Sequence, residues 1–395
     1  MIQSLRNPKV IQFIRENLHV NTADLVLASS KNTELPIKEI AVQIESRQRI
    51  KTKLPSWYAN FELILPRKVN LEQASSEATA EYKAMLFKGN RFLDLTGGSG
   101  VDAAAYAKKF KHIVYVEPNE ELCELAKHNF KVLGINADVV HSTAEDFISL
   151  NNEHFDLVYL DPSRRSDSKS RLVALEDYHP NVIELQEQLF NFTDRIVVKA
   201  SPMLDIKKSM RQLNHIEKVI CLSVDNEMKE VLFVLNKNAG SQPPEIICEN
   251  LGAPKSAQFT MTLQEENNAV STYSEPSTYL YDPLTAIRKG GGFNIFSQRF
   301  KLEKLAPNTH LYTSDVLNEE IPARIFKVIN EVTPSSKAIK KTAKNGYINV
   351  ISKNYPLSAN EIKKKYKIND GGERFLIFCT TQRNKVVLLC EAVSS

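Results

Sequence analysis

The stretch R-F-L-D-L-T-G-G-S-G-V-D-A, residues 91 to 103, decides the fold of this 395-residue chain. Its apolar first half predicts a buried strand over Arg91–Leu95, and a helical pattern follows over Val101–Phe110. Between the two stand Gly97, Gly98 and Gly100. Glycines at such a place permit a tight turn and a close approach of a ligand to the backbone. The stretch therefore predicts the first strand, turn and helix of an α/β domain.

Short β-rich runs and helical runs go on alternating as far as residue 236, which predicts a parallel sheet with helices on both faces. The predicted strands are Arg91–Leu95, Ile113–Glu117, Asp138–His141, Leu157–Leu160, Arg195–Lys199, Lys218–Ser223 and Glu230–Leu235. The predicted helices are Val101–Phe110, Glu120–Leu133, Asn181–Phe190 and Leu204–Leu213. Too few residues separate the last two strands for a parallel crossover, so they should pair as a hairpin. A doubly wound, Rossmann-like sheet with an antiparallel last strand is typical of class I methyltransferases, whereas plain dinucleotide-binding domains lack that hairpin.

The regions on either side differ in composition. Residues 1–70 read as short helices, one of them with Val10, Ile14 and Leu18 on a single face. Residues 236–244 are polar, carry Gly and Pro, and read as a linker. Weak strands up to about residue 263 and a final α+β region follow, with a helix over Ala359–Tyr366 and strands over Arg374–Thr380 and Lys385–Cys390. We expect a helical N-terminal domain (1–70), an α/β domain (71–238) and an α+β C-terminal region (239–395).

Composition excludes several classes of protein. The five cysteines include no C-x-x-C pair and the eight histidines have no ligand spacing, so neither a disulfide framework nor a metal site is expected. The chain has no run of 18 apolar residues, and its N-terminus does not resemble a signal peptide, so we expect a cytoplasmic protein without a membrane segment. A net charge of +4 neither requires nor excludes nucleic acid. The oligomeric state cannot be derived from the sequence.

Acidic residues around the glycine turn indicate which ligand it binds. Dinucleotide sites hold a pyrophosphate at the start of the helix, where free N–H groups favour anions. Here Asp94 precedes the turn and Asp102 lies in the first turn of the helix. Two carboxylates would repel a pyrophosphate, but they suit a ligand with an ammonium and a sulfonium, which is S-adenosylmethionine. Asp102 has a second interpretation as a plain helix-start acid.

Two further segments fit the same ligand. Glu117 ends the second strand, where an acid can accept hydrogen bonds from both ribose hydroxyls. Ala144 and Glu145 follow the third strand and could frame the adenine, Ala144 through its backbone N–H. The alternative is that Glu117 lies in a solvated loop and that Glu145 simply opens a helix, where acids are favoured.

The fourth strand ends in D-P-S-R-R, residues 161 to 165. Ligands of open α/β sheets bind outside the carboxyl ends of the strands, so Asp161 should lie beside the cofactor. Pro162 lacks an N–H, and the acceptors around it could hold an amine with its lone pair aimed at a methyl group. Arg164 and Arg165 could clamp phosphate, or be solvated. Lys199 ends the fifth strand, where it either lines the same cleft or is simply the end of a core strand. Pyrimidine C5-methylation needs a cysteine nucleophile, and neither Cys123 nor Cys221 suits it.

This motif series, D-x-T-x-G-x-G-x-D, a strand-end Glu and D-P-x-R-R, resembles prokaryotic class I RNA methyltransferases related to trimethylguanosine synthase. Many of these carry a THUMP-like C-terminal domain. Glu72–Ala84 is similar to the family segment that packs over the methionine end of the cofactor, and Tyr279–Arg288 and Asn349–Leu357 look THUMP-like. The resemblance implies that the cofactor binds to Asp94, Thr96, Gly97, Gly98, Gly100, Asp102, Glu117, Ala144 and Glu145. It implies that Asp161 and Pro162 are catalytic.

The resemblance further implies methyl transfer to a purine amine of RNA, in rRNA or tRNA. One departure stands out, because Ser163 and Arg164 replace the second proline and the base-stacking aromatic that relatives usually carry. Stacking must then come from elsewhere, or the acceptor is not a base amine.

The C-terminal region carries a basic segment. Residues 335–367 hold nine lysines, one acid and three interleaved tyrosines. Lysines with aromatics suit a phosphate track with stacking platforms, and we expect Lys340, Lys341 and Lys344 to bind RNA. A solvated lysine face is the alternative. Two rival functions remain open: a methyltransferase for a small molecule or a protein, and a non-catalytic RNA-binding protein with the same fold.

Overall fold

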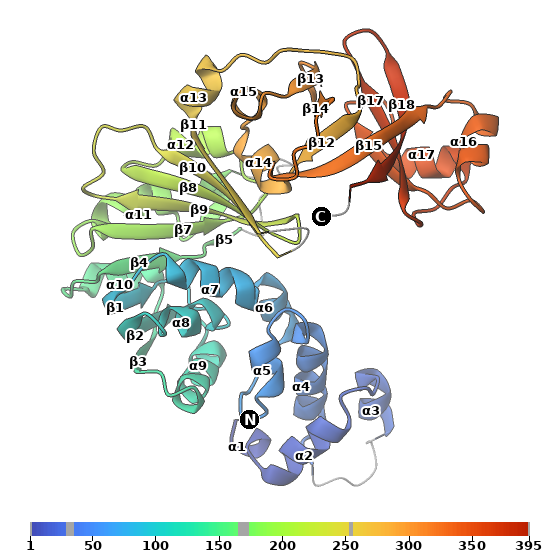
Figure 1. Ribbon diagram of the computed structural model, residues 1–395. Helices are drawn as coiled ribbons and strands as arrows, with labels where there is room; N and C mark the ends of the chain where they lie inside the picture. The colour runs from blue at the N-terminus through green and yellow to red at the C-terminus, as the bar shows by residue number, and fades with distance from the viewer. Residues whose placement is uncertain (1, 29–34, 165–173, 253–255, 394–395) are drawn as a thin grey trace. The chain divides into compact units, whose positions relative to one another are not determined.

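The computed structural model describes residues 2–28, 35–164, 174–252 and 256–393 (Figure 1). The chain forms two compact units. The first comprises Met1–Glu217 and Val231–Gly240, and the second comprises Lys218–Glu230 and Ser241–Ser395. No helix in the described ranges has the length and the apolar character needed to span a membrane.

Among the described residues, the larger sheet has nine strands in the order β11-β10-β8-β9-β7-β4-β1-β2-β3. The strands are β1 Gly89–Asp94, β2 Phe110–Glu117, β3 Ala137–His141, β4 Leu157–Leu160, β7 Arg195–Ala200, β8 Ile216–Val224, β9 Glu227–Asn236, β10 Glu245–Leu251 and β11 Ala257–Thr262. Strands β3, β2, β1, β4 and β7 are parallel to their neighbours, and β9 is antiparallel to β7. The side chains of the central strands β4 and β7 are buried almost throughout, as expected for the middle of a sheet covered on both faces.

The order of the strands creates a switch point. From β1 the chain proceeds to β2 and β3 on one side, and then returns to β4 and β7 on the other. Because parallel crossovers are right-handed, the helices of these two halves cover opposite faces of the sheet. The helices are α8 Val101–Tyr106, α9 Glu120–Val132, α10 Ala144–Leu150, α11 Val182–Leu189 and α12 Ile206–Met210. A crevice therefore opens outside the carboxyl ends of β1 and β4.

The predicted doubly wound fold is confirmed, with differences in detail. The predicted antiparallel strand is β9, which lies between β7 and β8. The weak strands expected after the linker are β10 and β11, and they extend the same sheet, β10 running parallel to β8. The first predicted helix was too long: it ends at Tyr106, and Phe110 begins β2, where its ring packs against Phe92 and Tyr106.

The described residues before the sheet form seven helices: α1 Ile2–Leu5, α2 Pro8–Glu16, α3 Thr22–Ala28, α4 Ile37–Ile50, α5 Pro55–Ala59, α6 Lys68–Gln73 and α7 Glu77–Met85. The buried faces of α2 and α4 share one apolar cluster with Leu122 and Leu125 of α9. Arg47 of α4 is buried, and its guanidinium donates to four backbone carbonyls between residues 57 and 63. These helices are thus packed onto the α/β core of the first unit.

The second unit holds a smaller sheet, with the order β13-β14-β12-β15-β18-β17-β16 among the described residues. Its strands are β12 Tyr279–Pro283, β13 Glu303–Ala306, β14 Thr309–Ser314, β15 Ala323–Glu331, β16 Asn349–Lys353, β17 Arg374–Thr380 and β18 Lys385–Ala392. Its helices are α13 Leu263–Asn268, α14 Thr285–Gly290, α15 Asn294–Phe300, α16 Ser336–Thr342 and α17 Ala359–Tyr366. The predicted helix α17 and strand β17 are confirmed residue for residue, and β18 continues two residues further than predicted.

Candidate functional site

A cavity of about 350 Å³ lies at the switch point, outside the carboxyl ends of β1, β2 and β4. Its volume is in the range of small-molecule sites. It is lined by nine of the predicted residues: Asp94, Thr96, Gly97, Gly98, Asp102, Glu117, Ala144, Glu145 and Asp161. A second cavity of similar volume is lined by Trp57, Ala104 and Phe110 among others, and it contains none of the predicted site residues. The fold thus brings four separate sequence segments to one place.

The glycine turn is fixed by an aromatic ring from β2. A Cβ atom on Gly97 would lie 2.2 Å from the ring of Tyr115, so only glycine fits there. The hydroxyl of Tyr115 donates to the carbonyl of Gly98 over 2.7 Å. Gly98 and Gly100 have φ angles of +56° and +76°, in the region that glycine adopts without strain. Gly100 does not line the cavity, so its contribution is the shape of the turn before α8.

Glu117 ties the glycine turn to the end of β2. Its Oε2 accepts from the N–H of Gly98 over 2.9 Å, and its Oε1 accepts from the N–H of Asn119 over 2.9 Å. Only 8% of the residue is exposed. A carboxylate has about four lone-pair sites, so two remain for a ligand in the cavity. The side chain is therefore held in place before any ligand binds.

Asp94 lies at the floor of the cavity. Its Oδ1 accepts from the N–H of Thr96 over 3.0 Å, and the hydroxyl of Thr96 in turn accepts from the N–H of Asp161 over 2.6 Å. Burial raises the pKa of Asp94 well above its ordinary value, and the nearby charges of Asp102, Asp161 and Glu117 raise it further. Within the described residues, neither Asp94 nor Glu117 forms an ion pair with a lysine or arginine. The described lining of the cavity therefore holds two carboxyl groups without a basic partner.

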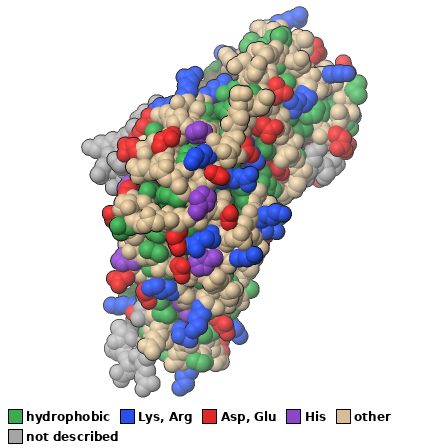
Figure 2. Space-filling model, turned by 90° about the vertical axis from the view of Figure 1, so that its left-hand side faces the viewer, with side chains coloured by type: hydrophobic (Ala, Val, Ile, Leu, Met, Phe, Trp, Pro, Cys, Tyr) green, Lys and Arg blue, Asp and Glu red, His purple; other side chains and the backbone are tan. Residues whose placement is uncertain are grey.

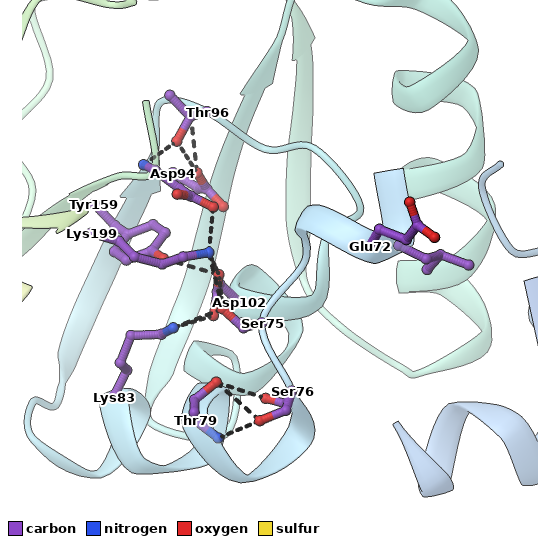
Figure 3. A network of polar contacts seen from close by, with 12 residues as sticks. Glu72, Ser75, Ser76, Thr79, Lys83, Asp94, Thr96, Asp102, Tyr159 and Lys199 are labelled. Atoms are coloured by element: carbon purple, nitrogen blue, oxygen red, sulfur yellow. Dashed lines mark hydrogen bonds and ion pairs between the residues drawn. The ribbon is translucent and has the colours of Figure 1, made fainter. Parts of the chain in front are cut away.

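Asp102 is bound by the protein itself, as Figure 3 shows. Its Oδ1 lies 3.1 Å from Nζ of Lys83, which is fully buried in α7. Its Oδ2 accepts from the hydroxyls of Ser75 and Tyr159, each over 2.9 Å. Burial alone would raise the pKa of Asp102, but Lys83 and Lys199 lower it to about 2. The carboxylate is thus ionised and largely satisfied beneath the cavity, and Asp102 is more than a helix-start acid.

Lys199 connects this network to the strand end where Asp161 lies. Its Nζ donates to Oδ2 of Asp161 over 2.5 Å and to Oγ of Ser75 over 3.3 Å, and it lies 3.9 Å from Oδ2 of Asp102. Lys199 therefore contacts the cavity residue Asp161 but does not itself line the cavity. We define Ser75, Lys83, Asp102, Tyr159 and Lys199 as the Asp102 network.

Sequence reasoning missed three members of the Asp102 network: Ser75, Lys83 and Tyr159. Ser75 and Lys83 lie in the segment Glu72–Ala84, which resembles the family segment near the cofactor, so a signal was present. Asn70, Gln73 and Ala74 from the same part of the chain line the cavity. Nothing in the sequence separates Tyr159 from an ordinary core residue of β4.

The segment after Asp161 forms one edge of the cavity. Pro162 is buried and does not line it. Ser163 begins the short strand β5 Ser163–Arg164, which pairs with β6 Tyr178–His179 and places Ser163 opposite His179. His179 lines the cavity, 55% of its side chain is exposed, and its Nδ1 lies 3.5 Å from Oε1 of Glu145. His179 is a site residue that sequence reasoning missed, because only the β5–β6 pairing brings it there.

The remaining predicted substrate residues fall into two groups. Arg165 and the side chain of Arg164 lie outside the described residues. Lys340, Lys341 and Lys344 are exposed in the second unit, in and just after α16. Their predicted contact with RNA therefore remains a prediction about a separate part of the chain.

Three family models match the chain. Residues 71–216 match conserved hypothetical protein 95, residues 279–322 match a ferredoxin-like domain, and residues 323–392 match a THUMP domain-like family. A comparison with curated proteins gives no significant match.

Among solved structures, the chain is similar to a protein from Porphyromonas gingivalis W83 that is provisionally described as a methyltransferase. The two share 29% identity over 99% of this chain and 98% of the other, with a TM-score of 0.88. The central domain has a methyltransferase fold. Residues 323–392 are THUMP-like, which confirms that part of the resemblance, while residues 279–322 are ferredoxin-like.

Two other similar structures cover a smaller share of this chain. A class I S-adenosylmethionine-dependent methyltransferase from Listeria monocytogenes, also a provisional assignment, shares 14% identity over 63% of this chain and 91% of the other, with a TM-score of 0.39. The Pyrococcus abyssi tRNA (uracil-54, C5)-methyltransferase shares 18% identity over 40% of this chain and 37% of the other, with a TM-score of 0.31. Neither carries an argument about function, and none of these matches names trimethylguanosine synthase.

The change Asp94→Asn should raise the free energy of unfolding of the ligand-free protein at neutral pH. Because burial raises the pKa of Asp94 in the folded state, its carboxyl group ionises more easily in the unfolded chain. The folded state therefore loses stability as the pH rises above the ordinary pKa of aspartate. The gain should shrink toward about pH 4. Urea unfolding at several pH values measures it, with the exposed Asp24→Asn as a control that changes stability by less than about 0.5 kcal/mol. A loss of stability at neutral pH would contradict this account.

Proposed function

We propose that this protein is an S-adenosylmethionine-dependent methyltransferase that acts on a purine exocyclic amine of rRNA or tRNA in the cytoplasm. The observation that carries the proposal is the acidic cavity at the switch point of a methyltransferase fold. Asp94 and Glu117 line it without a lysine or arginine partner among the described residues. Such a cavity favours a cationic ligand and repels the pyrophosphate of a dinucleotide.

The residues present fit this cofactor. Glu117 has two lone-pair sites left for ribose hydroxyls, and the glycine turn offers backbone close to the cavity. Ala144 and Glu145 line the far side, where an adenine would be framed. When bound, the cofactor supplies an electrophilic methyl group on a sulfonium. The chain supplies the charge complementarity that holds it.

Asp161 is the residue we assign to the acceptor. One carboxylate oxygen is engaged by Lys199 over 2.5 Å, which fixes the side chain, and a third of that side chain is exposed. Its other oxygen can accept a hydrogen bond from an amine and hold the nitrogen lone pair toward the cavity. Pro162 is buried behind it and shapes the strand end. This is positioning catalysis, in which the amine reacts because it is correctly oriented.

A covalent mechanism does not fit the site. Pyrimidine C5-methylation requires a cysteine nucleophile as a thiolate. Cys123 lies in α9, hydrogen-bonded to the carbonyl of Glu117, and burial raises its pKa to about 11. Its thiol is therefore protonated at neutral pH and faces the core. Cys221 lies inside β8, where it is buried as well.

His179 offers the stacking surface that Ser163 and Arg164 lack. It stands opposite Ser163 across the β5–β6 pair and lines the cavity beside Asp161. Unstacked RNA bases are commonly held on aromatic rings, including that of histidine. The THUMP-like residues 323–392 and the lysine-rich segment supply the expected RNA-binding part.

The change Glu117→Ala should weaken binding of S-adenosylmethionine by at least about tenfold, because hydrogen bonds to a charged acceptor are lost. Calorimetric titration of the purified protein measures the affinity, with NAD as the comparison ligand. The exposed Glu124→Ala, on the outer face of α9, is the matched control and should bind normally. Tight binding of NAD, or unchanged affinity in Glu117→Ala, would contradict the assignment.

The change Asp161→Ala should leave the affinity for S-adenosylmethionine unchanged and reduce methyl transfer by at least about a hundredfold, because the acceptor is no longer oriented. The assay is transfer of labelled methyl to RNA from cells that lack this protein. Full turnover in Asp161→Ala would refute its catalytic role. Cofactor binding without transfer to any RNA would instead favour a small molecule or a protein as acceptor.

The change His179→Ala should raise the KM for RNA by about tenfold, since stacking on one base contributes roughly 1–3 kcal/mol. His179→Phe should restore the KM, because phenylalanine keeps an aromatic ring and loses only the contact of Nδ1 with Glu145. The affinity for S-adenosylmethionine should stay constant in both variants. If both variants behave alike, His179 does not act through stacking.

A further inference from the structure

In the second unit, the carboxylate of Asp282 is shared by three cationic side chains. Arg288 donates through Nη1 to Oδ1 over 2.6 Å, and Lys353 donates through Nζ to the same oxygen over 2.6 Å. Arg324 donates through Nη2 to Oδ2 over 2.5 Å. We define these four residues as the Asp282 cluster.

The fold assembles the Asp282 cluster from four elements. Asp282 lies on β12, and Arg324 stands directly opposite it on β15. Arg288 lies in α14, which follows β12, and Lys353 ends β16. Asp282 and Arg288 belong to the ferredoxin-like residues, whereas Arg324 and Lys353 belong to the THUMP-like residues. The cluster thus lies where the two matched domains meet within one unit.

The charges of the Asp282 cluster do not balance. One cation would neutralise the carboxylate, so three leave two positive charges in surplus. Asp282 is fully buried, while the side chains of Arg288, Arg324 and Lys353 are 27%, 36% and 16% exposed. The acid is covered and the cations reach solvent. Since like charges repel at this range, an anion that approached from solvent would relieve the repulsion.

Neighbouring groups indicate the same positive potential. The pKa of His310 is lowered to about 4, mainly by burial and further by the positive charges of Lys304, Lys353 and Arg288. Nδ1 of His310 and Nε of Arg324 are buried polar atoms without a hydrogen-bond partner in the described part of the chain. Buried polar atoms are normally paired, so both nitrogens have unused hydrogen-bonding capacity.

We propose that the Asp282 cluster binds a phosphate group through Arg288, Arg324 and Lys353, and that this phosphate belongs to the RNA substrate. The second half of this statement rests on the proposed function. A guanidinium group can donate two parallel hydrogen bonds to the oxygens of one phosphate, and a lysine ammonium adds a point charge. Lys353 also belongs to the lysine-rich segment of residues 335–367. On the face shown in Figure 2, acidic and basic side chains are interspersed.

The first test is binding of inorganic phosphate to the full chain. Thermal unfolding is followed as sodium phosphate replaces sodium chloride at constant ionic strength. Phosphate should stabilise the wild type, and Arg324→Gln should abolish most of that stabilisation while leaving Asp282 paired with two cations. Arg374→Gln is the matched control, because Arg374 forms an exposed one-to-one pair with Glu391 on the same sheet. Arg288→Gln replaces Arg324→Gln if the latter does not fold.

The second test measures the affinity for a labelled single-stranded RNA by fluorescence anisotropy at several salt concentrations. Arg324→Gln should weaken binding by about tenfold. It should also reduce the slope of log affinity against log salt by about 0.7, the value for one lost phosphate contact. Arg374→Gln should match the wild type in both respects.

The two tests separate the two parts of the proposal. Equal phosphate stabilisation in the wild type and in Arg324→Gln would overturn the phosphate site. Phosphate binding that depends on Arg324, together with no RNA binding by the wild type, would keep the site but overturn RNA as the source of the phosphate. That second result would also count against RNA as the methyl acceptor, whereas loss of phosphate binding alone would not.

Discussion

The buried charge of Asp102 is the constraint on which the candidate site depends. Asp102 begins α8, and it is held by Lys83 from α7, by Tyr159 from β4 and, at 3.9 Å, by Lys199 from β7. A buried carboxylate without partners would be costly, so these elements must take up positions that satisfy it together. Such networks contribute more to the choice of one arrangement than to net stability. Here the arrangement sets the edge of the cavity where Asp161 lies.

This network also separates two kinds of acid that look alike in the sequence. Asp102 and Asp161 have lysine partners, whereas Asp94 and Glu117 are held by backbone N–H groups of the glycine turn and the strand ends. Lysines offset the charges of the first pair, whereas no described lysine or arginine pairs with Asp94 or Glu117. In the proposed function, Asp94 and Glu117 select the cationic ligand, and Asp161 orients the methyl acceptor.

The second unit contains a cluster in which positive charge is in excess. At Asp282, one acid holds three cations, so the surplus is positive and partly open to solvent. Among the described residues that line the cavity of the first unit, the acids outnumber the bases. A chain with a net charge of only +4 thus carries two local regions of opposite sign. Whole-chain charge is a poor guide to ligands for this reason, because fields are screened within about 10 Å.

Much of this protein follows from local sequence patterns. The period of apolar residues and the glycine turn predicted the doubly wound sheet, since strand and helix periodicities and glycine geometry act over a few residues. They also predicted nine residues of the cavity, because parallel strands bring their carboxyl ends to one edge. The sequence could not show that Lys83 and Lys199 meet Asp102, that His179 stands opposite Ser163, or that Lys353 reaches Asp282. Those contacts join residues 16 to 97 positions apart, and only the packing of whole elements decides them.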